Sequence, residues 1–167
     1  MFLILYPFYA IASLLFVVVT MIFAPLIAKF VDAEGNLPKW LSWFQTFDAT
    51  LFEGRQPQYG FTGTDEEVAT KWLRRNPGYT FDYEPLGVAW DKTQWTATFV
   101  KTQDGTTRFF AKGPNGQFNY EYGGKHLQVK LGWKAFNLYN ADTGTYRDGN
   151  WGPLPRIPVC FTIKPVL

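Results

Sequence analysis

An uninterrupted apolar stretch at the start of the chain constrains its fold more than any other feature. Residues 2–28 read FLILYPFYAIASLLFVVVTMIFAPLIA, and the first charged side chain is Lys29. Because a helix rises about 1.5 Å per residue, about 20 apolar residues suffice to cross the hydrocarbon core of a bilayer. A helix also satisfies its own backbone hydrogen bonds inside lipid. The stretch therefore predicts a transmembrane helix within residues 1–30.

A cleaved signal peptide and a buried core helix are the two alternative interpretations of this stretch. A signal peptide has a positive start and a shorter apolar region of about 7–15 residues, whereas no Lys or Arg precedes this stretch. A core helix this long and this apolar would be unusual in a chain of 167 residues. Lys29 and Lys39 follow the stretch, so the positive-inside tendency predicts a cytoplasmic soluble domain.

The next segment, LPKWLSWFQTFD at residues 37–48, is rich in aromatic side chains. Its apolar residues recur at helical spacing and would share one helix face: Leu37, Trp40, Leu41, Trp43 and Phe44. Tryptophan favours the headgroup layer because its ring is apolar and its N–H stays hydrated. We expect an interfacial helix and a loop within residues 31–63. The membrane-interface residues would be Trp40, Trp43, Phe44, Lys29 and Lys39. The alternative is that these rings pack on the core of the soluble domain.

A second helix is predicted directly after this segment, where Thr64 and Glu67 match the capping-box pattern. Acidic residues occupy its first turn and basic residues its last turn, as the helix dipole favours. Asn76-Pro77-Gly78 would end the helix. Its basic residues are candidates for contact with lipid or a protein partner: Lys71, Arg74 and Arg75. A solvated helix face is the alternative explanation of these charges.

Beyond this helix the apolar period changes from helical spacing to two, which is typical of strands. Strands are expected at about 95–100, 106–112, 117–122, 127–133 and 158–164, with turns at Asp104-Gly105, residues 113–116 and Gly123-Gly124. Residues 140–156 are polar and rich in Gly and Pro, so a long loop is expected there. Short connections between neighbouring strands imply an antiparallel meander. The predicted fold class is α+β, with residues 64–167 forming a helix plus an antiparallel domain of about five strands.

The sequence offers little catalytic chemistry. With His126 and Cys160 as the single histidine and cysteine, no Cys/His metal cluster and no intrachain disulfide can form. His126 follows a glycine turn and is expected to be an ordinary turn residue. Cys160 lies within a predicted strand and is expected to be a small buried hydrophobe. A net charge of +2 gives no reason to expect nucleic-acid binding. We therefore predict no catalytic, cofactor or metal site.

Two motifs resemble those of small phage-encoded proteins described as membrane proteins with a domain of unknown function. One is L-P-x-W-L-x-W-F-Q-T-x-D at Leu37–Asp48, and the other is W-L-x-R-N-P-x-Y-x-F at Trp72–Phe81, followed by Leu86-Gly87. The chain departs from these proteins at residues 49–52, where Asn-Pro-Leu is common, and at Thr80, where Gly is common. The resemblance implies a phage origin. It assigns no catalytic residue to this chain.

Three functions follow as hypotheses. The first is a phage accessory protein in the host inner membrane, with lipid and a protein partner as its contacts and self-association as a further option. Such a protein could alter host envelope processes. The second is a virion component that releases its apolar segment into the membrane during infection. The third is an enzyme acting on a membrane-borne substrate, which would require a concave pocket with converging polar groups.

Overall fold

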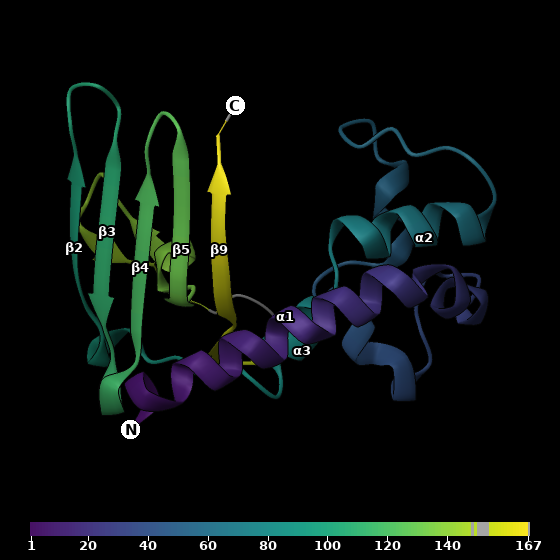
Figure 1. The fold of residues 1–167 in the computed structure, drawn as a ribbon, viewed down its shortest axis with the longest axis horizontal. Coiled ribbons are helices and arrows are strands. Elements are labelled where there is room, and N and C mark those ends of the chain that lie inside the picture. Colours follow the sequence, from purple (N-terminus) through teal and green to yellow (C-terminus); the bar gives the residue numbers. More distant parts are fainter. Residues whose placement is uncertain (148, 150–153, 167) are drawn as a thin grey trace. The chain divides into compact units, whose positions relative to one another are not determined.

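The computed structural model describes residues 1–147, 149 and 154–166, and it divides the chain into two compact units (Figure 1). The first, here called the sheet unit, comprises Met1–Ile11 and Leu86–Leu167. The second, here called the helical unit, comprises Ala12–Pro85. These units are compact groups of contacts, so the predicted division at residues 30 and 63 stays a prediction.

The apolar stretch forms one long helix, α1 (Phe2–Ile27), which continues as the short 3₁₀ helix η1 (Ala28–Phe30). By length and composition, Phe2–Phe30 could cross a membrane. The expected long N-terminal apolar helix is therefore confirmed. Its first residues belong to the sheet unit and the remainder belongs to the helical unit.

Helix α2 (Asp65–Arg75) in the helical unit begins at the predicted capping box. The Thr64 hydroxyl accepts from the Glu67 backbone N–H at 3.3 Å, and the Thr64 N–H donates to Glu67 Oε2 at 2.9 Å. A cap of this kind stabilises a helix by about 1 kcal/mol. The helix ends at Asn76, and Gly78 adopts the left-handed conformation with φ 67° before the short helix α3 (Tyr79–Tyr83). The predicted start and end of this helix are confirmed.

The aromatic segment is a 3₁₀ helix, η2 (Lys39–Phe44), where an α-helix was expected. A 3₁₀ helix has three residues per turn, so residues i and i+3 share a face. Trp40 and Trp43 accordingly lie on an exposed face, while Leu41 is buried. The predicted single face joining Leu37, Trp40, Leu41 and Phe44 is wrong, because that face requires a period of 3.6.

The core of the helical unit collects apolar residues from α1, η1, η2, α2 and η3 (Leu51–Arg55). Helix η3 lies in the region 49–63 that was expected to be a loop. The buried core residues are Ala24, Ile27, Ala28, Leu37, Leu41, Leu51, Ala69, Trp72 and Leu73. The core thus includes the last turns of α1.

The sheet unit contains five antiparallel strands in the order β2-β3-β4-β5-β9 (Figure 1). Their bounds are Thr96–Lys101, Thr107–Lys112, Phe118–Gly123, Leu127–Trp133 and Val159–Pro165. Each strand begins within one residue of the predicted start. The expected α+β fold with an antiparallel meander is confirmed, and β9 extends it by pairing with β5.

In its described residues, the sheet unit also contains two short strand pairings and three 3₁₀ helices, η4 (Lys92–Gln94), η5 (Pro114–Gly116) and η6 (Ala135–Leu138). Strand β1 (Val88–Ala89) pairs with β8 (Arg156–Ile157), and β6 (Tyr139–Asn140) pairs with β7 (Thr145–Tyr146). The region 140–156 therefore contains part of a hairpin where a continuous loop was expected. Residues 148 and 150–153 of that predicted loop lie outside the described residues.

One face of the sheet is covered by the chain after β5. The ring of Phe109 lies 4.9 Å from that of Phe136 and 5.0 Å from that of Tyr139, measured between ring centroids. Asn119, fully buried on this face, donates from Nδ2 to the Leu131 carbonyl and accepts from the Phe136 N–H. This face forms the core of the sheet unit.

Candidate functional site

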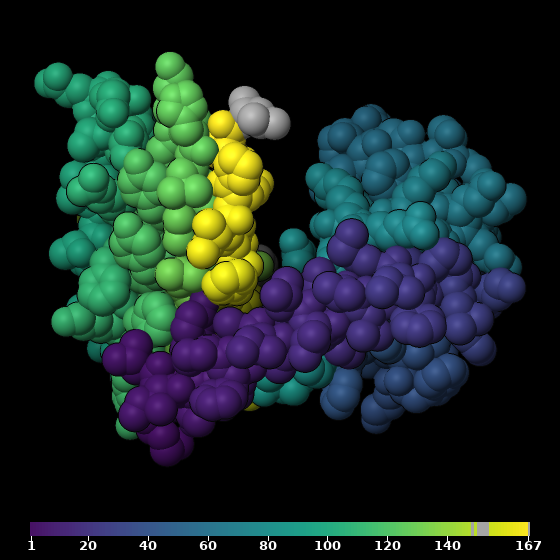
Figure 2. Space-filling model, viewed as in Figure 1, coloured from purple at the N-terminus to yellow at the C-terminus, as the bar shows by residue number. Residues whose placement is uncertain are grey.

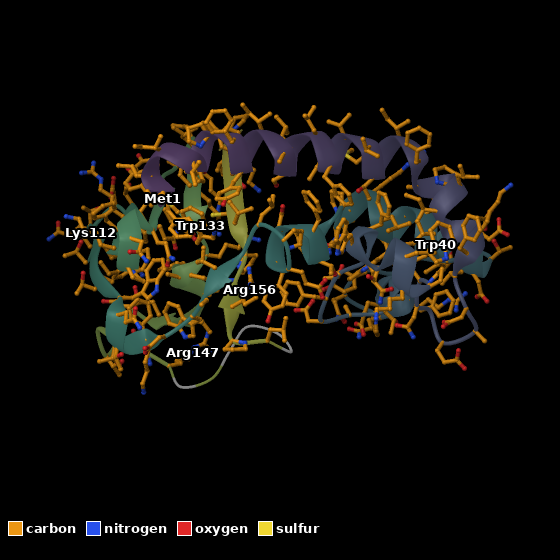
Figure 3. The ribbon with its side chains drawn as sticks, turned by 90° about the horizontal axis from the view of Figure 1, so that it is seen from below. Met1, Trp40, Lys112, Trp133, Arg147 and Arg156 are labelled. Atoms are coloured by element: carbon orange, nitrogen blue, oxygen red, sulfur yellow. The ribbon has the colours of Figure 1, made fainter. Side chains whose placement is uncertain are left out.

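The outward side of α1 carries a continuous row of bulky apolar side chains, here called the outer stripe. The exposed fractions of its members range from 45% to 75%: Ile4, Phe8, Ile11, Leu15, Val18, Ile22 and Leu26. They are spaced by three or four residues, so they lie on one face of the helix. Figure 3 shows apolar side chains projecting from the outer side of α1 along its length. A contiguous row of this kind is typical of an interaction surface.

The opposite side of α1 is buried, although its residues are smaller or more polar. Its members are Tyr6, Ala10, Ser13, Thr20, Ala24 and Ile27. The Thr20 hydroxyl donates to the Phe16 carbonyl at 2.8 Å, so it is satisfied within the helix. A surface helix of a water-soluble protein has the reverse arrangement, with large apolar residues inside. Helix α1 therefore presents its most apolar side to its surroundings.

The start of α1 is held on the sheet by a cluster of aromatic rings around Trp133. The rings of Phe2, Tyr6 and Tyr9 lie 5.6, 5.8 and 6.0 Å from the Trp133 ring. The Tyr6 hydroxyl donates to the Cys160 carbonyl at 2.8 Å. The Met1 ammonium group donates to the Asn115 carbonyl at 3.1 Å. Met1 and Trp133 are labelled in Figure 3.

The later part of α1 is held within the helical unit by stacked rings. The Phe16 ring lies 4.7 Å from the Phe44 ring and 4.1 Å from the Phe81 ring, both nearly parallel to it. A Cβ at Gly78 would lie 2.7 Å from the Phe16 ring, so this close approach requires glycine. Phe44, which was expected to lie at the membrane interface, is thus half-buried against α1.

The other residues predicted for the membrane interface are exposed. Trp40 is 70% exposed and Trp43 is 49% exposed, and the Trp40 ring meets the Phe30 ring edge-on at 5.3 Å. Lys29 and Lys39 are also exposed. Two indole rings and two ammonium groups thus accompany η1 and η2. Their contact with lipid stays a prediction.

The basic residues of α2 separate into two environments. Lys71 and Arg74 line a surface pocket of about 430 Å³ together with Pro25, Lys29, Glu66, Glu67 and Thr70. Two acidic side chains in this pocket oppose its basic ones, and Lys71 Nζ already donates to the Thr62 carbonyl at 2.7 Å. Arg75 instead lies over the Tyr59 ring at 4.3 Å. The three residues predicted for lipid or partner contact therefore do not form one site.

The second face of the sheet is also apolar and is here called the open face. Strand register places its members in two neighbouring rows, largely apolar apart from Thr98 and Arg108: Thr98, Phe110, Tyr120, Leu131 and Phe161 in one, and Val100, Arg108, Tyr122, Val129 and Ile163 in the other. Val100, Phe110, Phe161 and Ile163 are exposed. Figure 2 shows the strands, coloured green to yellow, as a broad surface. The sequence signal for this face was the pair Phe109-Phe110, which places an aromatic ring on each side of β3.

Titratable groups with shifted pKa values belong to turns or to the core. A hydrogen bond from the Thr93 hydroxyl is the main cause of the lowered pKa of Asp91. A hydrogen bond from the Thr102 hydroxyl is likewise the main cause of the lowered pKa of Asp104. Burial raises the pKa of Tyr146. His126 is exposed in the β4–β5 turn, and Cys160 is buried as expected. Among the described residues, no group of three His, Cys, Asp or Glu side chains could hold a metal ion.

The whole chain, residues 1–167, matches the family described as "Family of unknown function (DUF7338)". No curated protein and no solved structure matches the chain. The expected domain of unknown function with an N-terminal apolar helix is confirmed. The family description assigns no activity, and the exposed apolar surfaces are the features of the chain that point to one.

Proposed function

We propose that this chain, which belongs to the DUF7338 family over its whole length, is a membrane-anchored accessory protein. Helix α1 anchors it to a lipid bilayer, and the open face of the sheet binds a protein partner. The outer stripe is the observation that supports the anchor. Removing one large apolar side chain from water is worth about 1.5–3 kcal/mol, so lipid contact along the whole stripe gives a strong driving force.

The residues beside the stripe favour lipid over a soluble partner. No charged side chain interrupts Phe2–Ala28, whereas protein interfaces usually have a polar rim. Trp40 and Trp43 are exposed near Lys29 and Lys39, which is the mixture found where helices meet headgroups. Lysine can keep its charge in water while its aliphatic stem lies along apolar surface.

The bilayer that we propose is the inner membrane of a bacterial host. The motif resemblance to phage-encoded membrane proteins supports this choice, together with the two lysines that follow α1. The sheet unit would then lie on the cytoplasmic side. An accessory role in the host envelope is favoured over catalysis, because the outer stripe and the open face both expose large apolar side chains.

The anchor is tested by vesicle flotation of the full chain. Substituting three stripe residues, Phe8→Ser, Leu15→Ser and Ile22→Ser, should lower the vesicle-bound fraction at least about 100-fold, because each change removes roughly 1.5–3 kcal/mol of apolar transfer. The matched control carries Val100→Ser, Phe110→Ser and Ile163→Ser on the open face and should float as the wild type does. Equal flotation of the stripe variant and the wild type would contradict the proposal.

The partner-binding role of the open face is tested by cross-linking in infected cells. A tagged wild-type chain should give a defined adduct, and the open-face variant described above should lower its yield at least about 5-fold, because it removes three exposed apolar side chains. Gln103→Ser, at an exposed polar position between β2 and β3, serves as the control and should leave the adduct unchanged. An adduct that persists in the open-face variant would rule out this face.

A further inference from the structure

We propose that α1 lies in the plane of the membrane surface and does not cross the bilayer. In this arrangement the outer stripe sinks into the boundary between headgroups and acyl chains of one leaflet, to a depth of about 5–10 Å. The inference rests on the proposed function, since it specifies how α1 meets lipid. It replaces the crossing helix that the length and composition of the stretch favoured.

The start of α1 is attached to the sheet unit. Its Tyr6 hydroxyl donates to the Cys160 carbonyl, and its Phe2 and Tyr9 rings contact Trp133. Trp133 and Cys160 come after the helix in the chain and lie in the sheet unit. The beginning of α1 is therefore attached to structure that the chain forms later.

The end of α1 is attached to the helical unit. Phe16 stacks on Phe81, and Ala24 and Ile27 share a buried core with Trp72. Phe81 and Trp72 also come after the helix and lie in the helical unit. The end of α1 is therefore attached to later structure as well.

The membrane topology of the chain decides whether both attachments can persist. Among the described residues, α1 is the one helix long and apolar enough to cross a membrane, so everything after it lies on one side. With 26 residues it is about 39 Å long, and a crossing would place its two ends at opposite membrane surfaces. Because both ends contact later residues, a crossing would break one of the two sets of contacts. An in-plane helix keeps both.

Large and small side chains lie on different sides of α1. A crossing helix without neighbours meets lipid on every side and has no reason to separate large from small residues. In α1 the small or hydroxyl-bearing residues, such as Ala10, Ser13 and Thr20, face the protein, whereas the outer stripe does not. Within each unit, the side of α1 that packs on that unit corresponds to the polar face of an ordinary interfacial helix.

The occupant of the outer stripe is a leaflet that contains anionic lipid. Lys29 and Lys39 are exposed beside Trp40, so their ammonium groups can pair with headgroup phosphates while the indole ring lies at the same level. Phe2–Phe30 contains no acidic side chain, and the nearest acids in the sequence are Asp32 and Glu34, which are exposed between the two lysines.

The sidedness of the Met1 amino group tests this inference. The full chain is added to sealed vesicles of phosphatidylcholine and phosphatidylglycerol, then treated near neutral pH with a membrane-impermeant amine reagent. Mass spectrometry measures the label on Met1. An in-plane helix predicts equal labelling before and after detergent opens the vesicles.

A crossing helix would place Met1 inside the vesicle, protected at least about 10-fold until detergent is added, and this result would overturn the inference. The proposed anchor would survive that result, since the protein would still be bound. Wild-type protein that does not float with vesicles would overturn both.

A disulfide between α1 and the sheet unit supplies a second measurement. A Cβ built at Gly116 lies 3.6 Å from the Leu3 Cβ, within the range of disulfide bridges. The Leu3→Cys, Gly116→Cys variant, oxidised, should float with vesicles as well as its reduced form does, because an in-plane helix keeps this contact. Loss of flotation on oxidation, restored by reduction, would show that binding needs release of the helix start and would overturn the inference.

Discussion

Replacing Trp133 with alanine is expected to lower the free energy of unfolding in detergent solution by about 3–5 kcal/mol, the usual range for removing a large buried aromatic side chain. Trp133 is completely buried, and its ring meets those of Phe2, Tyr6, Tyr9 and Phe118. The cavity would open between the start of α1 and the sheet. Urea unfolding followed by far-ultraviolet circular dichroism measures the change without relying on tryptophan fluorescence.

The variant Trp133→Phe separates packing from hydrogen bonding. Trp133 Nε1 donates to the Leu86 carbonyl at 3.0 Å, and phenylalanine would leave that buried acceptor without this donor. We expect Trp133→Phe to lower the free energy of unfolding by about 1–3 kcal/mol, a smaller loss than that of the alanine variant. Equal stability of the alanine variant and the wild type would contradict the ring cluster as the attachment of α1.

Replacing Gly132 with alanine is expected to disrupt the pairing of β4 and β5. Gly132 has φ 94°, and an added Cβ would lie 2.1 Å from the Phe118 carbonyl oxygen. Because that oxygen belongs to the backbone, the strand itself must move. Strain at a positive φ, together with this displacement, should lower the free energy of unfolding by at least about 2–4 kcal/mol. Urea unfolding measures this loss, and hydrogen exchange at β4 and β5 should show where it occurs.

Gly105→Ala is the matched control for this prediction. Gly105 has φ 83° in the β2–β3 hairpin, but an added Cβ would meet nothing within 4 Å. Alanine at position 105 is disfavoured only by its positive φ, so we expect the free energy of unfolding to fall by about 1 kcal/mol. If the two variants lost the same stability, the steric explanation at Gly132 would be wrong.

Local patterns were sufficient to predict α2 and the five-stranded sheet. The Thr64–Glu67 capping box and the Asn76-Pro77-Gly78 stop are set by neighbouring residues, so they do not depend on tertiary contacts. Turns such as Asp104-Gly105 similarly fix where strands begin and end. The segment 158–164 predicted the strand β9, whereas its place beside β5 is set by tertiary pairing, since no short connection joins the two strands.

The aromatic segment could not be predicted correctly because its period was ambiguous. Leu37 and Leu41 are four residues apart, as in an α-helix, but both are buried in a structure where Lys39–Phe44 winds with three residues per turn. Leu37 and Leu41 are both buried in the core of the helical unit, and the tighter 3₁₀ winding leaves Trp40 exposed to solvent. Tertiary packing, which cannot be read from the local sequence pattern, determines the 3₁₀ conformation of this segment.

The two faces of α1 were not predicted, because large apolar residues surround the whole helix and conceal the difference between its sides. A signal was nevertheless present. Residues with small or hydroxyl-bearing side chains recur at helical spacing at Ala10, Ser13, Thr20 and Ala24, and these positions are the ones that the protein buries. In a long apolar helix, the small residues indicate the protein-facing side better than the large ones do.

The hydrogen bond from Tyr6 to Cys160 joins residues separated by 154 positions, which has a consequence for biosynthesis. At ribosomal rates of about 5–20 residues per second, α1 emerges roughly 8–30 s before its partner strand exists. During that interval the nascent chain exposes its most insoluble segment. If α1 is anchored to lipid as proposed, the bilayer can cover this segment during the interval, and the strands of the sheet unit then pack on a helix that is already bound.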